Sequence, residues 1–393
     1  MPTFYGEPDK PGKGTSVTRD VAILLGRLQK NGIQGLVVDL RDNGGGSVNE
    51  AVRMTGLFID QGPVVQLKDP DREIHLVTEQ PGKALYEGPM VVLENKLTAS
   101  ASEIFSAAMQ DYRRAAIVGD SSTFGKGSVQ AVIELNRFID QIGDTSDLAG
   151  ALKITIEKIY RVTGESTQVK GVISDLKIPS LTEITPFGEN EQEHRLAYDA
   201  VPPATLDVAR NAKLLFLDEL RRRSTARIKE DPLLQDLIHE IAYADESTEK
   251  NRVSLNEKVR KNELAEVARL QDKADSDRKT ARAQDRNKYY QLILADADKT
   301  ELRLINGSEP DGSVQTASTD TSLQLFPDSH QRGPGKRDFD ELTENEAITR
   351  ETLNILSDLV DLTKARQMAR GRLERGGCGY GLTAARPNSP KSP

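Results

Sequence analysis

The chain has 393 residues, enough for two or three domains, with an apolar fraction of 37% and no tryptophan. A net charge of −8 and an isoelectric point near 5.4 argue against a nucleic-acid-binding protein. The single cysteine, Cys378, excludes an internal disulfide framework and a cysteine-based zinc site, and we expect no metal or other cofactor.

The first six residues, Met1 to Gly6, lack the basic and apolar regions of a secretory signal, so we expect no signal peptide in the chain as written. No stretch approaches the roughly 18–20 apolar residues that span a bilayer, and we expect no transmembrane segment.

Helix and strand patterns alternate over the first third of the chain. Apolar spacing predicts a helix over 15–30 and a buried strand over 35–40. Ser47 and Glu50 have the spacing of a capping box, which predicts a helix from Ser47 to about Phe58. The further elements predicted are a helix over 101–112 and strands over 64–67, 74–77, 89–94 and 115–118. This alternation predicts an α/β layer with a largely parallel sheet.

The composition changes after about Thr185, where the chain becomes charged and helical in period. A stretch rich in Ser, Asp, Gly and Pro separates this part from a last amphipathic helix. We predict a core over 1–184, a charged helical domain over 185–305, a flexible linker over 306–338, a terminal helix of that domain over 339–369 and a disordered tail over 370–393.

Ser100 is the first candidate for chemistry. It lies in Thr98-Ala-Ser-Ala-Ser-Glu103, between a predicted strand and a predicted helix. Small neighbours let a substrate carbonyl approach, and a helix N-terminus offers N–H donors to an oxyanion. A structural interpretation is also open, because Ser100 and Glu103 have the spacing of a capping box.

Lys126 is the second candidate, in a glycine-flanked loop between two apolar strands. A nucleophilic serine needs a base, and of the histidines His75, His194, His239 and His330 only His75 lies in the α/β region, in the predicted hairpin. A lysine can serve if it is neutral, which requires its pKa to fall by roughly 3 units from about 10.4. A surface lysine or a phosphate ligand is the alternative.

A Walker A phosphate loop is excluded by the spacing around Lys126. Five residues separate Gly119 from Gly125, and Gly127 stands where the loop needs a hydroxyl. Nucleotide binding is therefore not expected.

Three further positions could support Ser100 and Lys126. Gln130 shares a face with Lys126 in an extended segment and could hold its amine, although an exposed strand glutamine fits equally. The turn Gly44–Gly46 could donate an N–H to an oxyanion, or could simply precede a capped helix. Asp111 falls roughly 16 Å along the helix from Ser100, which favours a structural role.

Several ordered motifs together resemble the tail-specific protease family, the C-terminal processing peptidases. The charged helical region also resembles the C-terminal domain of the longer bacterial members, and the resemblance covers roughly residues 3 to 366. The motifs are Val37-Val-Asp-Leu-Arg-Asp-Asn-Gly-Gly-Gly46, Leu57-Phe-Ile-Asp-Gln-Gly-Pro-Val64, Ser100-Ala-Ser-Glu-Ile-Phe105, Met109-Gln-Asp-Tyr112, Thr123-Phe-Gly-Lys-Gly127 with Gln130, Ile159-Tyr-Arg-Val-Thr-Gly164, Ser166-Thr-Gln168 and Asn251-Arg-Val-Ser-Leu-Asn256.

The resemblance assigns roles to individual residues. It implies that Ser100 is the nucleophile, Lys126 the general base and Gln130 the glutamine that orients the lysine. The oxyanion donors would be the N–H groups of Ala101 and, within the glycine turn, of Gly46.

An aspartate that matches Asp111 counts among the family's essential residues. The helix geometry predicts that Asp111 supports the site rather than relaying a proton.

The resemblance also implies a ClpP/crotonase-like α/β core followed by a mostly α-helical C-terminal domain. The function it implies is a serine endopeptidase that cleaves polypeptides near apolar C-termini. Expected partners are unfolded or tagged polypeptide substrates and an adaptor protein or second copy of the chain, in the periplasm.

Two features depart from the family pattern. Family members carry an N-terminal region and a PDZ domain before the segment at which this chain starts, and the loop after Gly119 is one residue longer here. An alternative interpretation follows: a catalytically silent fragment whose helical C-terminal region is a protein-interaction module.

Overall fold

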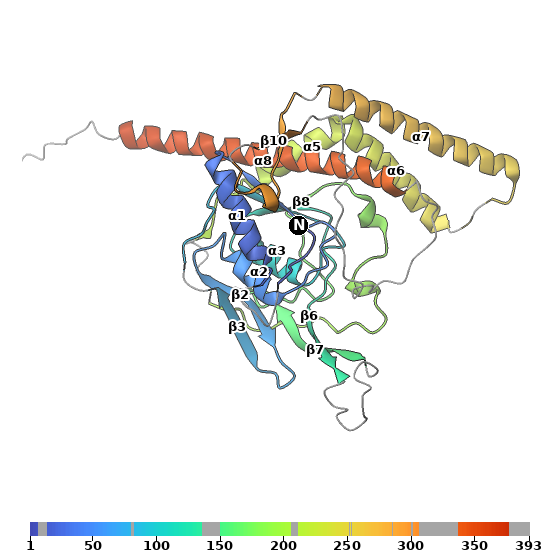
Figure 1. The fold of residues 1–393 in the computed structure, drawn as a ribbon. Coiled ribbons are helices and arrows are strands. Elements are labelled where there is room, and N and C mark those ends of the chain that lie inside the picture. The colour runs from blue at the N-terminus through green and yellow to red at the C-terminus, as the bar shows by residue number, and fades with distance from the viewer. Residues whose placement is uncertain are drawn as a thin grey trace, which may run out of the picture.

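A computed structural model gives the fold of the chain (Figure 1). It describes residues 1–6, 14–79, 82–135, 150–205, 211–250, 252, 254–284, 286–299, 302–305 and 337–376.

A four-stranded parallel sheet lies at the centre of the fold. Its strands run in the order β1 (Leu36–Asp39), β4 (Met90–Glu94), β5 (Ala116–Gly119) and β8 (Leu176–Lys177). Every residue of β4 and β5 is buried. Short apolar runs of this kind suit a parallel sheet, because such a sheet is covered on both faces.

The two faces of the sheet are covered by different parts of the chain. Val92 and Ile117 face a core formed with α1 (Val17–Lys30), α2 (Val48–Thr55) and α3 (Ala101–Asp111). Their neighbours in sequence point the other way, and this second set packs against Leu220, Leu234, Ile355 and Leu359 of the C-terminal helices. The predicted α/β core followed by a mostly helical C-terminal region is confirmed, whereas the predicted domain boundaries stay a prediction.

A second, antiparallel sheet was not expected from the largely parallel layer that the sequence predicts. Its strands run in the order β3 (Ile74–Glu79), β2 (Gly62–Lys68), β7 (Ala151–Tyr160) and β6 (Ser128–Glu134). The predicted hairpin of β2 and β3 is present, and β2 also pairs with the distant β7. Local hydrophobic periodicity does not reveal which distant strand completes such a sheet.

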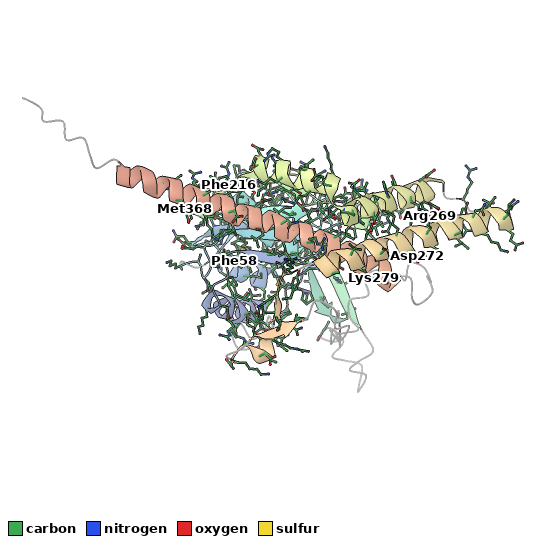
Figure 2. The ribbon with its side chains drawn as sticks, turned by 90° about the horizontal axis from the view of Figure 1, so that it is seen from above. Phe58, Phe216, Arg269, Asp272, Lys279 and Met368 are labelled. Carbon is green, nitrogen blue, oxygen red and sulfur yellow. The ribbon has the colours of Figure 1, made fainter. Side chains whose placement is uncertain are left out.

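Where the structure describes it, the C-terminal region contains four longer helices and a small hairpin. Helix α7 projects from the body, and its labelled side chains Arg269, Asp272 and Lys279 are charged (Figures 1 and 2). Among the described helices, none is both long enough and apolar enough to cross a membrane. The elements are η2 (Leu181–Ile184), η3 (Glu189–Glu191), α5 (Leu217–Glu230), α6 (Pro232–Lys250), α7 (Glu257–Gln284), β9 (Tyr289–Gln291), η4 (Leu294–Asp296), β10 (Arg303–Ile305) and α8 (Arg337–Gly376).

Helix α8 is longer at both ends than the terminal helix predicted over 339–369. Within the predicted linker, residues 306–336 lie outside the described residues, as do residues 377–393 of the predicted tail.

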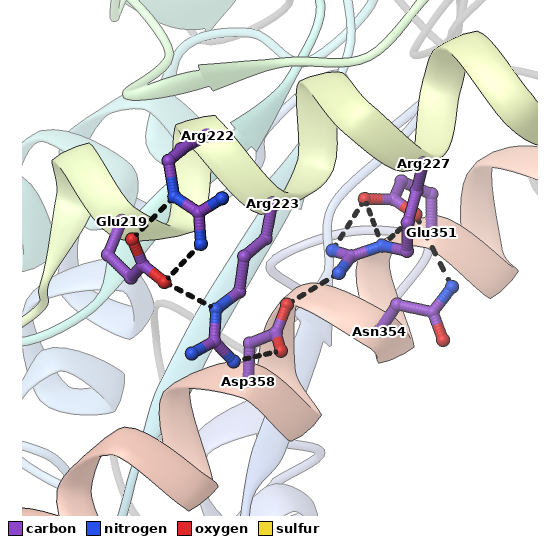
Figure 3. A network of polar contacts seen from close by, with 7 residues as sticks. All are labelled: Glu219, Arg222, Arg223, Arg227, Glu351, Asn354 and Asp358. Carbon is purple, nitrogen blue, oxygen red and sulfur yellow. Dashed lines mark hydrogen bonds and ion pairs between the residues drawn. The ribbon is translucent and has the colours of Figure 1, made fainter.

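An ion-pair network joins α8 to α5 (Figure 3). Arg227 of α5 donates from Nε and Nη2 to the carboxylate of Glu351, whose side chain is 1% exposed, at 2.8–3.2 Å, and from Nη1 to Asp358 at 2.6 Å. Arg223 reaches the other oxygen of Asp358 at 2.7 Å. The network therefore connects α5 to α8, whose apolar residues pack on the second face of the sheet.

Candidate active site

Three loops meet at the carboxyl edge of the parallel sheet, because each follows one of its strands. The loop after β1 leads to α2, the loop after β4 leads to Ser100, and the loop after β5 carries Lys126. Thr98 joins them: its hydroxyl donates to the Leu40 carbonyl at 2.8 Å, and its own carbonyl accepts from the Phe124 N–H at 2.9 Å. This edge is where α/β sheets usually place their sites.

Ser100 lies at the N-cap position of α3 in a strained conformation. Its φ of 58° and ψ of −116° fall where a residue with a side chain is costly. The predicted capping box is formed in part through Glu103, whose carboxylate accepts the Ser100 N–H at 2.7 Å. The next residue, Ala101, is the first of the helix, where an N–H has no intrahelical acceptor.

The glycine turn Gly44–Gly46 packs directly against Ser100. A Cβ at Gly45 would lie 2.8 Å from the Ser100 Cβ, so only glycine fits there. The Gly45 N–H donates to Asn43 Oδ1 at 3.0 Å, and the Asn43 carbonyl accepts the Ala99 N–H at 3.0 Å. The turn is therefore fixed beside the serine, and Gly46, with φ of 138°, continues it toward α2.

The side chain of Glu103 is a clamp between the serine turn and the lysine loop. It is fully buried, and its two oxygens accept four hydrogen bonds. Besides the Ser100 N–H, the donors are the Thr123 hydroxyl at 2.5 Å, the Gly125 N–H at 2.7 Å and the Lys126 N–H at 2.9 Å. One carboxylate thus binds the backbone on both sides of the candidate site.

Burial raises the pKa of Glu103 to about 7, while its four donors favour the ionised form. A protonated carboxyl would lose acceptor capacity among these four donors, three of which are N–H groups that cannot accept its O–H in return. The clamp is therefore best assembled above neutral pH.

Lys126 is half-buried and next to Gln130. Its Nζ donates to Gln130 Oε1 at 3.2 Å. Burial lowers the pKa of Lys126, the positive charge of Lys153 lowers it further, and the carboxylates of Glu189 and Glu103 oppose both. A lowered pKa is what a lysine needs to act as a base near neutral pH.

Asp111 lies at the far end of α3 from Ser100 and pairs with Arg161. The Asp111 side chain is 4% exposed, and its Oδ2 accepts from Arg161 Nε at 3.2 Å. The same guanidinium donates to Gln110 Oε1 at 2.9 Å. Burial raises the pKa of Asp111, and Arg161 opposes the rise.

Replacing Asp111 with asparagine is expected to lower the free energy of unfolding by about 3 kcal/mol, because Arg161 is then buried without its carboxylate. Urea unfolding measures this loss. Asp218→Asn is the matched control, since Asp218 pairs with Arg221 at the fully exposed surface and its loss should leave stability unchanged. A folded Asp111→Asn protein of normal stability whose Ser100 no longer reacts would instead place Asp111 in the chemistry.

Sequence reasoning missed the main role of Glu103, which it treated only as part of a cap. Its partners at Thr123, Gly125 and Lys126 lie twenty or more residues away in the chain, so no local pattern indicates them. His75, the one histidine of the α/β region considered as a base, instead lies 3.0 Å from Asp69 in the β2–β3 hairpin.

A serine on a strained turn between a strand and a helix, at the carboxyl edge of a sheet, presents its hydroxyl as a nucleophile in some serine hydrolases. The chain belongs to the tail-specific proteases of peptidase family S41. Residues 1–178 match "Peptidase family S41", and residues 182–361 match the "C-terminal domain of tail specific protease".

Two relatives whose names describe proteases of this kind support the assignment to the family. The chain is 40% identical over 276 residues to the "Tail-specific protease" of Haemophilus influenzae, an alignment of 69% of this chain and 38% of that protein. It is 36% identical to the "Carboxy-terminal-processing protease" of Bartonella bacilliformis, over 37% of this chain and 31% of that protein. The aligned chain thus spans well under half of each relative.

Among solved structures, the chain is similar to the "Photosystem II D1 C-terminal processing protease". The sequence identity is 29% and the TM-score 0.37, over 45% of this chain and 41% of that one.

Proposed function

We propose that the chain is the catalytic part of a serine endopeptidase that cleaves polypeptides near apolar C-termini through a Ser100–Lys126 dyad. The observation that carries the proposal is the Glu103 carboxylate, which hydrogen-bonds to the backbone of both residues. The relatives named as a tail-specific protease and as a carboxy-terminal-processing protease support the choice of a polypeptide substrate. The apolar preference and a periplasmic location follow from the family resemblance.

In the proposed reaction, neutral Lys126 takes the proton of Ser100 as Oγ bonds to the scissile carbonyl carbon. The N–H groups of Ala101 and Gly46 stabilise the oxyanion that forms. The Lys126 ammonium then protonates the leaving amine as the C–N bond breaks, which leaves an acyl ester on Ser100. Water hydrolyses the ester with Lys126 again as the base, and Gln130 keeps the amine in place throughout.

The partners proposed are unfolded or tagged polypeptides, with an adaptor protein or a second copy of the chain as possible further components. No cofactor enters the reaction, because each step moves a proton between Ser100, Lys126, water and substrate.

A fluorophosphonate probe tests the proposal without requiring a polypeptide substrate. Mass spectrometry should find the adduct on Ser100 and not on its neighbours Ser102 or Ser106, both fully buried. The labelling rate should rise as pH increases from about 6 to 9, because Lys126 must lose its proton and the Glu103 clamp must be ionised.

The proposal fails if the folded protein stays unlabelled over this pH range, or if the adduct lies on other serines. An unlabelled but folded protein would favour the silent interaction module instead.

A further inference from the structure

Residues 187–204, here called the strap, cross the loop that carries Lys126. The Glu189 N–H donates to the Phe124 carbonyl at 2.9 Å, two residues before Lys126. At its far end, the Val201 N–H donates to the Gly164 carbonyl at 2.9 Å. The strap follows the S41 match in sequence and belongs to the part that matches the C-terminal domain.

Asp199 anchors the strap to the antiparallel sheet. Its carboxylate accepts from the Tyr160 hydroxyl at 2.9 Å and from Lys68 Nζ at 3.1 Å, and it also pairs with Lys158. Lys158 Nζ donates to the Ala197 carbonyl of the strap at 3.0 Å. Two strands of the sheet therefore hold this end of the strap in place.

Gln168 connects the strap to the lysine loop. Its side chain is fully buried, and Oε1 accepts the Gly127 N–H at 2.8 Å. Its Nε2 donates to two groups of the strap, Glu189 Oε1 at 2.8 Å and the Leu196 carbonyl at 3.0 Å. A Cβ at Gly127 would lie 2.8 Å from the Gln168 Cβ, so the loop packs directly on this side chain.

The residue after Gln168 is held in a costly conformation against the same loop. Val169 has φ of 70°, which is rare for a β-branched residue, and its N–H donates to the Gly125 carbonyl at 2.7 Å. Such strain persists only where surrounding contacts determine the backbone. The peptide groups on both sides of Lys126 are thus bound by the segment that contains Gln168.

We propose that Gln168 is a positioning residue for Lys126, through which the strap fixes the lysine loop. This inference rests on the proposed dyad. The charged groups that face Lys126 come from three other elements: Lys153 of β7, Glu189 of the strap and Glu103 of α3. With Gln168 in place, Lys126 stays desolvated among these groups and near the serine turn.

Gln168→Ala tests the proposal through the pH dependence of Ser100 labelling by a fluorophosphonate. Without the amide, the Gly127 N–H loses its acceptor, the loop loosens and Lys126 becomes better hydrated. The midpoint of the rise in labelling rate should move up by about half to one pH unit. At pH 7 the rate should fall about tenfold, since small misplacements of a catalytic group are costly.

A second test exchanges the amide of Gln168 and the carboxylate of Glu189, which keeps the net charge. This test does not require the Gln168→Ala protein to fold. Gln168→Glu alone puts a carboxylate against Glu189 and should also raise the midpoint. Adding Glu189→Gln restores the donor between the two positions and the net charge near Lys126, so the midpoint should return toward that of the unmodified protein.

Gln66→Ala is the matched control for loss of a buried amide. Gln66 is 4% exposed and donates to the Arg161 and Pro202 carbonyls, so it contacts the strap but not the lysine loop. It should lower stability while leaving the pH midpoint unchanged.

Two results separate the inference from the function on which it rests. A pH midpoint unchanged in both Gln168→Ala and Gln168→Glu, with Ser100 still labelled, overturns the role of Gln168 and leaves the dyad intact. A folded unmodified protein that the probe never labels overturns the dyad, and the inference with it.

Discussion

Arginine at position 126 is expected to abolish both fluorophosphonate labelling and proteolysis, with a rate loss of about 10³-fold or more. The guanidinium keeps its proton at any pH at which the protein is folded, because its pKa lies above about 12. It can replace the charge of Lys126 and donate to Gln130, but it cannot accept the Ser100 proton. Raising the pH to about 10 should therefore restore nothing.

Lys153→Arg is the matched control for this change. Lys153 lies on β7 and lowers the pKa of Lys126 by its charge, which arginine preserves. Its labelling rate and pH midpoint should equal those of the unmodified protein. A Lys126→Arg protein that still labels at Ser100 and cleaves an unfolded polypeptide would remove Lys126 as the base.

Local sequence patterns predict the elements of this fold better than their long-range pairing. Ser47 and Glu50 predict the start of α2, and the Glu50 N–H does donate to Ser47 Oγ at 3.3 Å. The predicted end at Phe58 is three residues late, because the helix stops at Thr55. The pairing of β2 with β7 joins Gln66 to Tyr160, and neither strand's own sequence indicates the other.

The same limit applies to the candidate site. The sequence indicates Ser100, Lys126 and Gln130 as a group, and the Lys126–Gln130 hydrogen bond is present. The groups that hold them are Glu103 and Gln168, whose polar atoms bind backbone more than twenty residues away. A buried side chain that accepts backbone N–H groups leaves no periodicity or spacing in the sequence.

For the C-terminal helices, the sequence predicts the type of secondary structure but not where the helices pack. Their period predicts helices, but not that Leu220 and Ile355 cover one face of the parallel sheet while the strap reaches the lysine loop. An all-parallel sheet is covered on both faces, and the C-terminal helices supply the cover of the second face. They therefore complete the core of the α/β part as well as forming a region of their own. The loops of the candidate site therefore contact residues from both parts of the chain.

Ser100→Gly and Ser100→Ala are expected to be equally inactive, with losses of about 10⁴-fold or more, but to differ in stability. Both remove the nucleophile. Alanine keeps a Cβ at φ of 58° and ψ of −116°, whereas glycine adopts this conformation without strain. Glycine also loses more chain entropy on folding, which offsets part of this gain. The net expectation is a free energy of unfolding about 1 kcal/mol higher for Ser100→Gly than for Ser100→Ala.

Urea unfolding of the two variants measures that difference, and probe labelling with hydrolysis of an unfolded polypeptide measures the activity. Ser102→Gly is the control, because Ser102 is helical and glycine there should only destabilise. If Ser100→Gly were no more stable than Ser100→Ala, the turn would not be strained in solution. If either variant hydrolysed the polypeptide as fast as the unmodified protein does, a group other than Ser100 would be the nucleophile. The expected result, greater stability with no activity, would mean that the fold keeps a strained residue at this position for its reactivity.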